Sequence, residues 1–275
     1  MQPSRAAGAQ NLLVYVDSHC HLSIPELATR LPEICAAMGA AGVDRALCIC
    51  TTLEEFDRVH ALATSHDNFW CSAGVHPDCE DVREPGVGDL LVLAAKPKVV
   101  AIGETGLDYY RLGGRSIADM EWQRERFRVH IRAARRSGLP LVVHTRSAAA
   151  DTLRVLREEQ GELAGGVFHC FTESADVARA ALDLGFYISF SGILTFKTAT
   201  ELRKVAAFVP IDRCLIETDS PYLAPVPYRG KTNSPAYVPW VARQLAELKG
   251  MDLAEVAAAT SRNFERLFAR TLETT

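Results

Sequence analysis

Residues 12–21 read LLVYVDSHCH, an apolar run followed by two histidines one residue apart. Apolar runs of this length are typical of buried strands in a parallel sheet. Side chains on a strand alternate between its two faces, so His19 and His21 point the same way, where two neutral imidazoles can chelate one cation. An isolated H-x-H pair is more often structural than metal-binding, so the rest of the chain has to decide between the two roles.

The same kind of run recurs along the chain. Eight runs rich in β-branched residues lie at about 13–17, 45–50, 69–75, 98–103, 139–144, 165–170, 186–191 and 213–218. Helical patterns separate most of them, and Gly42, Gly138 and Gly185 stand where a helix would end and the next strand begin. Eight alternations of strand and helix predict an α/β fold with a parallel sheet, closed into a (β/α)8 TIM barrel that is possibly distorted. An open doubly wound sheet is the alternative. No G-x-G-x-x-G motif follows a strand, so we expect no dinucleotide cofactor.

Three further segments bear on the fold and the site. Residues 252–268 predict an extra C-terminal helix, opened by Asp252 as N-cap with Glu255 three residues later. Two longer connections, 105–119 and 220–236, follow the fourth and eighth strands. Long loops at the carboxyl ends of barrel strands usually shape the substrate site.

Length and composition favour one globular domain over residues 13–270, preceded by a disordered leader at 1–12 that lacks the apolar stretch of a signal peptide. Hydrophobic residues make up 48% of the 275 residues and charged residues 23%, and no run is long enough to cross a membrane. The eight cysteines lie mostly in apolar runs, which favours reduced thiols and a cytoplasmic protein. A net charge of −4 gives no global attraction to nucleic acid, so a phosphate-polymer substrate would need a local positive field.

Residue types that bind metals follow the ends of five apolar runs: His19, His21, Glu104, His144, His169 and Asp219. Four histidines and two carboxylates exceed the three or four protein ligands of one zinc ion, so we predict two divalent ions that share one carboxylate. The mixed nitrogen and oxygen donors suit zinc, manganese, iron or nickel, and magnesium less well. Glu104 alone could instead be a buried acid in a salt bridge, which also requires a nearby cation.

Seven motifs, taken in order, resemble those of the TatD-type hydrolases, which belong to the amidohydrolase-like superfamily of metal-dependent hydrolases. They are D-S-H-C-H at 17–21, G-V-H-P at 74–77, G-E-T-G-L-D-Y at 103–109, H-T-R at 144–146, F-H-C-F at 168–171, E-T-D-S-P at 217–221 and R-G-K-T-N-S-P at 229–235. The resemblance runs from about residue 16 to residue 268 and implies a distorted barrel with a divalent-metal nuclease site. It implies the same six metal ligands, with Glu104 as the bridging one. The implied activity is hydrolysis of DNA, typically as a 3′→5′ exonuclease on single strands or frayed ends, although some relatives are linked to RNA or damaged ends.

We therefore predict that a water activated by two metal ions attacks the phosphorus. His19, His21 and Asp219 would hold one ion and His144 and His169 the other, with Glu104 between them as the second catalytic carboxylate. Asp219 is also the candidate to accept the proton of the water. Glu217, two residues earlier on the same strand, either orients a histidine or closes a core ion pair.

Five residues near these strand ends are predicted to contact the substrate: His76, Arg146, Arg229, Lys231 and Asn233. Guanidinium groups match phosphate oxygens in a bidentate manner, and a histidine can donate to a phosphate oxygen. Three tyrosines at 109, 110 and 222 either stack on unpaired bases or pack in the core or a lid.

Two alternatives to a nuclease remain open at this point. The first is a hydrolase of a small ester, lactone or amide in the same superfamily, since a fold does not dictate a substrate. Relatives of that kind often carry a carbamylated lysine on the fourth strand, where this chain has Glu104. The second is a binding protein without activity, which a complete set of metal ligands disfavours. The native metal, DNA against RNA, the polarity of degradation and the oligomeric state are left open by the sequence.

Overall fold

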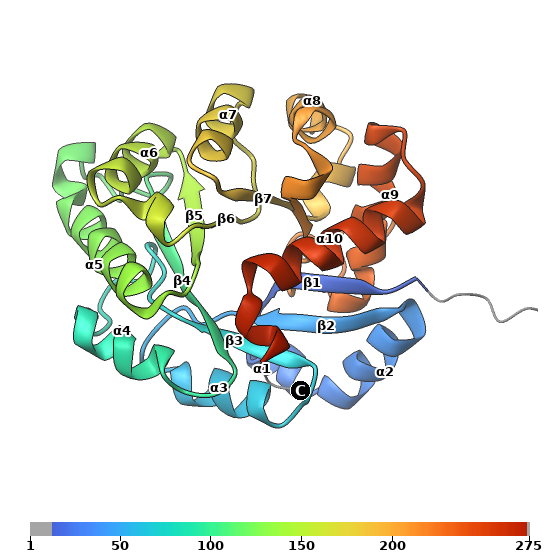
Figure 1. The fold of residues 1–275 in the computed structure, drawn as a ribbon, viewed down its shortest axis with the longest axis horizontal. Helices are drawn as coiled ribbons and strands as arrows, with labels where there is room; N and C mark the ends of the chain where they lie inside the picture. The colour runs from blue at the N-terminus through green and yellow to red at the C-terminus, as the bar shows by residue number, and fades with distance from the viewer. Residues whose placement is uncertain (1–12, 274–275) are drawn as a thin grey trace, which may run out of the picture.

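The computed structural model describes residues 13–273, so the leader predicted at 1–12 lies outside the described residues. Eight parallel strands pair in sequence order to form one sheet (Figure 1). They are β1 Tyr15–Cys20, β2 Val43–Cys48, β3 Phe69–Ala73, β4 Val99–Asp108, β5 Leu141–Arg146, β6 Gly166–Phe168, β7 Tyr187–Phe190 and β8 Cys214–Ile216. The predicted (β/α)8 barrel is confirmed, because each strand follows the one before it around the sheet.

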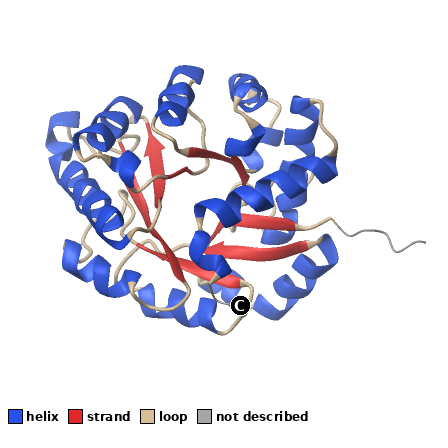
Figure 2. Cartoon of the chain, viewed as in Figure 1, coloured by secondary structure: helices blue, strands red, loops and turns tan. Residues whose placement is uncertain are grey.

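Helices surround this ring of strands (Figure 2). They are α1 Pro25–Ala28, α2 Leu31–Ala41, α3 Phe56–Thr64, α4 Val87–Ala94, α5 Glu121–Ser137, α6 Ala149–Glu158, α7 Ala175–Asp183, α8 Thr200–Phe208, α9 Val238–Lys249 and α10 Leu253–Leu267. Gly42 and Gly138 end α2 and α5 in the left-handed conformation, with φ of 75° and 70°, as the sequence predicted. None of the helices among residues 13–273 is both long and apolar enough to span a bilayer.

The barrel closes only near the carboxyl ends of β1 and β8. Regular pairing links β1 to β2 and continues to β8, whereas β8 meets β1 through a single bridge between Cys20 and Ser220. Around it, the Asp219 amide donates to the His19 carbonyl at 2.9 Å, and the His21 amide donates to the Ser220 carbonyl at 2.9 Å. This incomplete closure is the distortion of the barrel, and its bonds lie beside three of the predicted metal ligands.

Asp17 joins the same two strands deeper in the barrel. Its buried carboxylate accepts hydrogen bonds from the amide of Thr218 at 2.9 Å and from the Thr218 hydroxyl at 2.5 Å. Burial raises the pKa of Asp17 to about 8, against the opposing effect of these donors. A polar cross-link therefore holds β1 and β8 where backbone pairing does not.

The interior of the barrel is an apolar cluster closed at one end by α10. Inward side chains such as Val16, Val100 and Val142 pack with Phe264 and Phe268 from the C-terminal segment. The Asn263 amide donates to the Cys214 carbonyl at 2.8 Å, so α10 sits against the amino-terminal end of β8. Figure 1 shows this helix, in red, running across the near end of the barrel. The extra C-terminal helix predicted over 252–268 is thus present, and it plugs the end opposite the predicted site.

Candidate metal centre

A cavity of about 650 Å³ opens at the carboxyl ends of the strands. Its lining includes His21, His76, Glu104, His144, His169 and Asp219. These residues come from strands or loops far apart in the sequence, and the barrel brings them to one rim. A rim of this kind is where barrel enzymes place their chemistry.

Glu104 lies at the centre of this site and is almost fully buried. Its Oε2 atom lies 3.3 Å from Nε2 of His19 and 4.0 Å from Nε2 of His21. Its other oxygen, Oε1, lies 2.8 Å from Nε2 of His169 and 3.2 Å from Nδ1 of His144. One carboxylate therefore faces two sets of imidazoles, one at each oxygen, as a bridging ligand must. The sets adjoin where the rings of His19 and His169 stack with their centres 3.8 Å apart.

Asp219 completes the first set. Its Oδ1 atom lies 3.2 Å from Nε2 of His21 and 3.6 Å from Nε2 of His19. The backbone of Asp219 is left-handed, with φ of 56°, a conformation that aspartate tolerates better than most residues. Five of the six predicted metal ligands thus line one cavity, and the sixth, His19, is buried beside Glu104. The ligand atoms of His19, His21 and Asp219 lie within 4.8 Å of one another.

His76 stands closer to this centre than its predicted role of substrate contact requires. Its Nε2 atom lies 3.2 Å from Oε1 of Glu104 and 3.4 Å from Nδ1 of His144. Together with Glu104 and His144 it forms a group whose ligand atoms lie within 4.8 Å of one another. The second set of donors therefore contains three imidazoles, one more than the sequence predicted.

Two buried carboxylates orient the imidazoles from behind. Oδ2 of Asp108 lies 3.0 Å from Nε2 of His144, and Oε1 of Glu217 lies 3.2 Å from Nδ1 of His169. Each carboxylate accepts a hydrogen bond from a ring N–H. In the neutral imidazole the other ring nitrogen, which faces Glu104, then has a free lone pair. Glu217 thus contacts a histidine, as in the first of the two roles that the sequence predicted for it. Asp108 was missed because the sequence predicted a loop over 105–119, whereas β4 continues to Asp108. The available signal was its spacing from Glu104, since residues four apart on a strand share a face.

Glycines let β4 approach β5 closely enough for these contacts. At Gly106, where φ is 134°, a Cβ atom would lie 2.0 Å from the carbonyl oxygen of His144. The second glycine of the G-E-T-G motif is therefore required by the packing of β4 against the strand that carries His144.

The donor set fits a pair of divalent cations. One ring N–H of His144 and one of His169 are hydrogen-bonded to Asp108 and Glu217. The ring nitrogens that face the Glu104 carboxylate therefore require positive charge between them and it, which a metal ion or a second ring proton supplies. Nε2 of His169 is buried without a hydrogen-bond partner, although Oε1 of Glu104 is 2.8 Å away. Mixed imidazole and carboxylate ligands with these orienting partners are the pattern of a transition-metal or zinc site.

The pKa shifts of His169 and Glu104 also indicate that the site favours positive charge. Burial opposes protonation of His169, but the carboxylates of Glu104 and Glu217 outweigh it and raise the pKa of this imidazole well above its usual range. Burial likewise disfavours the charged form of Glu104, yet the surrounding imidazoles, His169 foremost, hold the pKa of this carboxyl well below its usual range.

The residues predicted to contact substrate separate into two groups. His76 and Arg146 line the cavity, and the Arg146 guanidinium lies 2.8 Å from Oδ2 of Asp108. The other three, Arg229, Lys231 and Asn233, are absent from the cavity lining. The guanidinium of Arg229 lies 3.7 Å from the centre of the Phe196 ring, and the Lys231 ammonium lies 5.7 Å from that of Tyr228.

Asn233 is fully buried, and its amide nitrogen donates to the carbonyls of Thr218 at 2.8 Å and Tyr222 at 2.6 Å. It therefore ties the 220–236 loop to the end of β8. Tyr109 is also buried, with its hydroxyl donating to Asp151 at 2.8 Å, so the alternative of core packing holds for that tyrosine. Tyr110 and Tyr222 are exposed.

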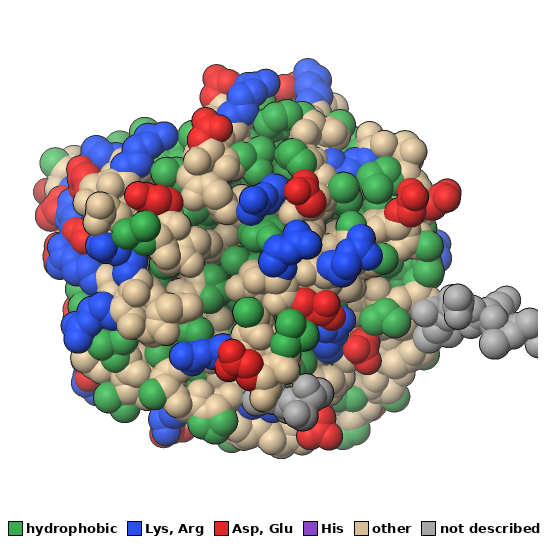
Figure 3. All heavy atoms as spheres, viewed as in Figure 1, with side chains coloured by type: hydrophobic (Ala, Val, Ile, Leu, Met, Phe, Trp, Pro, Cys, Tyr) green, Lys and Arg blue, Asp and Glu red, His purple; other side chains and the backbone are tan. Residues whose placement is uncertain are grey.

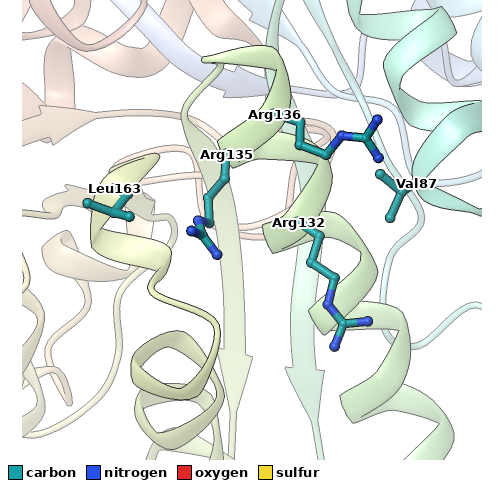
Figure 4. Close-up of a pocket in the computed structure, with 5 residues that line it drawn as sticks. All are labelled: Val87, Arg132, Arg135, Arg136 and Leu163. Carbon is teal, nitrogen blue, oxygen red and sulfur yellow. The ribbon is translucent and has the colours of Figure 1, made fainter.

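A second hollow, of about 420 Å³, lies on the outer surface between α4, α5 and the turn Gly161–Leu163 (Figure 4). Its lining consists of Val87, Arg132, Arg135, Arg136 and Leu163. Arg132 pairs with Glu159 at 2.6 Å, and Arg135 donates to Gln160 at 3.0 Å. No acid or histidine lines this hollow among residues 13–273, so it offers no metal ligands.

Comparisons with known proteins identify a family for this chain. Residues 16–269 match the family described as TatD related DNase. The chain is 49% identical over 257 residues to the uncharacterized metal-dependent hydrolase YcfH of Escherichia coli K12, with 92% of this chain and 95% of that protein covered. It is 35% identical over 247 residues to the 3′-5′ ssDNA/RNA exonuclease TatD of Citrobacter rodentium, with 88% and 92% covered. The crystal structure of YjjV, a TatD homologue from E. coli, superposes with a TM-score of 0.85 at 27% identity, covering 94% of this chain and 99% of that one.

Proposed function

The chain belongs to the TatD-related DNase family, and from this premise we propose that this metal-dependent hydrolase cleaves the phosphodiester bonds of DNA. We further propose that it acts as a 3′→5′ exonuclease on single strands or frayed ends. The main support is the position of Glu104, whose two oxygens face two sets of imidazoles. The relative from Citrobacter rodentium, described as a 3′-5′ exonuclease of single-stranded DNA and RNA, supports the same activity and leaves RNA as a second substrate.

In this proposal His19, His21 and Asp219 hold one divalent ion and His144 and His169 hold the other, with Glu104 shared. His76 is a further candidate ligand of the second ion. When bound, the ions supply a lowered pKa for water and a positive charge beside the phosphate. Zinc and manganese suit these donors best.

The remaining steps fall to the side chains of the chain. Asp219 accepts the proton of the attacking water, because a carboxylate in this position stays ionised: burial raises its pKa, but the imidazoles of His21 and His19 outweigh burial and lower it. Arg146, at the cavity wall, binds a phosphate oxygen of the substrate. We place the protein in the cytoplasm, since all eight cysteines are free thiols.

The test is cleavage of end-labelled single-stranded DNA by the manganese-loaded protein, with and without chelator, beside a panel of nitrophenyl esters. Glu104→Ala should lower DNA cleavage roughly a thousandfold or more, since it removes the ligand common to both ions. Far-UV circular dichroism should stay unchanged, because the Glu104 side chain faces the cavity and not the apolar interior.

The matched control is Glu201→Ala, which removes an exposed acid on α8 paired only with Lys204. It should cleave like the parent. Turnover of esters without DNA cleavage by the loaded parent would contradict the nuclease proposal, and so would full activity and metal content in Glu104→Ala.

A further inference from the structure

We propose that Tyr222 and Tyr110 form two base-stacking platforms on opposite sides of the metal centre, so that the site accepts only nucleotides whose bases are unpaired. This inference rests on the proposed function, because it concerns the polynucleotide that this centre would cleave. In this inference the rings of Tyr222 and Tyr110 cause the preference for single strands.

The two tyrosines follow strands on opposite sides of the barrel. Tyr110 follows β4 and Tyr222 follows β8, and strands four places apart in a sheet of eight lie on opposite sides of a barrel. Tyr110 is 65% exposed and Tyr222 is 56% exposed. They are the two of the seven tyrosines, all within the described residues, that stand among the exposed large side chains. Tyr222 lines the cavity, and Tyr110 lies beside Arg146, which also lines it.

Tyr222 is held rigidly beside the proposed metal ligands. Its amide donates to the Asp219 carbonyl at 3.0 Å, and its carbonyl accepts from the buried amide of Asn233 at 2.6 Å. The ring lines the cavity, with its centre 6.3 Å from that of His21 in an edge-on arrangement. A base stacked on this ring would belong to a nucleotide next to the bond being cleaved. Since the loop is already ordered, stacking loses little backbone freedom.

Tyr110 is anchored on the other side by the carboxylate that orients His144. Its amide donates to Oδ1 of Asp108 at 2.9 Å. The guanidinium of Arg146 lies 4.6 Å from the centre of the Tyr110 ring and 2.8 Å from Oδ2 of Asp108. A phosphate-binding cation and a base-stacking ring thus form one unit, the pairing used by proteins that bind single strands.

Two opposed rings select against duplex DNA for a physical reason. In a duplex each internal base face is covered by its neighbours and each base edge by its partner. Only the outer face of the terminal pair is free, so bases of a duplex cannot stack on both rings. A frayed or single-stranded end offers free faces, and every base has one, so this selection does not depend on sequence. Paired ends would have to melt before they enter the cavity.

The test removes the ring from the protein and the base from the DNA. Binding is measured by fluorescence anisotropy of a labelled oligothymidylate with phosphorothioate linkages, which resist cleavage, and of the same backbone without bases. Tyr222→Ala and Tyr110→Ala should each weaken binding of the oligothymidylate about tenfold. Tyr222→Phe should stay within about twofold of the parent, because stacking needs the ring and not the hydroxyl. On the base-free backbone the alanine variants should lose less than about twofold, since no stacking partner is left.

The matched control is Phe208→Ala. Phe208 is another exposed ring with an arginine beside it, Arg179 at 4.9 Å, but it lies at the end of α8 outside the cavity. It should bind both oligonucleotides like the parent.

The inference would be overturned if Tyr222→Ala bound the oligothymidylate as tightly as the parent does. It would also be overturned if the variant lost the same affinity for the oligothymidylate and for the base-free backbone. A parallel cleavage assay on unmodified oligothymidylate separates the two proposals. If the parent cleaves the DNA but the affinity loss of the alanine variants does not depend on the bases, the nuclease proposal holds and the platforms are contradicted. If the affinity loss depends on the bases but the parent does not cleave the DNA, the platforms are supported and the nuclease proposal is contradicted.

Discussion

At the scale of single residues, the site depends on carboxylates that fix which nitrogen of a histidine carries the proton. Asp108 does this for His144 at 3.0 Å and Glu217 does it for His169 at 3.2 Å. Burial raises the pKa of Asp108, but the His144 imidazole and the hydrogen bond from Tyr110 outweigh it and lower the pKa to about 2. Asp108 is therefore an anion at any working pH and a permanent acceptor for His144 and Arg146.

Asp108→Ala should weaken metal binding about 10- to 100-fold, because His144 loses the partner that fixes its ring and its tautomer. Competition against a fluorescent chelator measures this directly. Asp151→Ala is the control, since Asp151 also pairs with arginines, Arg124 at 3.3 Å and Arg154 at 3.1 Å, but contacts no histidine. Unchanged metal affinity in Asp108→Ala would show that His144 is oriented without it.

At the scale of elements, α5 supports the loop that carries His76. His130, fully buried on α5, accepts a hydrogen bond from the amide of Val75 at 2.9 Å, and its other nitrogen donates to the Arg126 carbonyl at 2.7 Å. The neutral ring satisfies both partners, whereas a protonated ring cannot accept from Val75. Burial lowers the pKa of His130 to about 4.

This shift makes part of the folding stability depend on pH. A histidine in the unfolded chain has a pKa near 6.5 and is protonated below that pH. In the folded chain His130 stays neutral down to about pH 4, so between these pH values only the unfolded state binds the proton. The contribution of His130 is thus complete above pH 6.5 and is lost as the pH falls. By pH 5 the loss should reach about 2 kcal/mol.

Urea unfolding of the parent and of His130→Gln at pH 7.5 and pH 5 tests this prediction. The glutamine variant should be less stable at pH 7.5 and should lose less stability between the two pH values, by the amount assigned to His130. An identical pH dependence in both proteins would contradict a neutral, buried His130.

At the scale of the whole molecule, the two ends of the barrel have different tasks. One end carries the candidate metal centre, and the C-terminal segment closes the other by placing Phe264 and Phe268 in the apolar interior. Figure 3 shows the face over α10, where positive and negative side chains alternate. Apolar packing at this end and the candidate metal ligands at the opposite rim agree with the general division of barrels into a stability end and a chemistry end.

Phe264→Ala should lower the free energy of unfolding by about 3–5 kcal/mol, because it empties a fully buried site in the barrel interior. Where the variant is still folded, its metal affinity should match that of the parent, since the centre lies at the far end. Val92→Ala, at a 66% exposed position on α4, should be nearly neutral. Chemical denaturation and chelator competition provide both measurements, and a coupled loss of metal binding would contradict the separation of the two ends.

Much of this molecule was predictable because its signals are local. Eight apolar runs separated by helical patterns require no knowledge of distant contacts, and the carboxyl ends of parallel strands meet at one edge whatever the exact curvature. The convergence of His19, Glu104 and Asp219 could therefore be predicted from their places at the ends of apolar runs, although β4 continues beyond Glu104 to Asp108. The helix over 252–268 was equally visible in its capping residues and apolar spacing.

Other features depend on how the elements pack, and no local pattern encodes them. Asp108 reaches His144 only because β4 continues past Gly106 and lies against β5. His76 lies among the candidate metal donors, and Asn233, which was predicted to contact the substrate, is buried and bonds to the backbone at Thr218 and Tyr222. The sequence by itself determined the barrel and the inventory of ligands, since periodicity and strand ends are properties of short segments. Tertiary structure alone decided which atom faces which, because distances of 3 Å between residues far apart in the chain are set by the packing of the whole barrel.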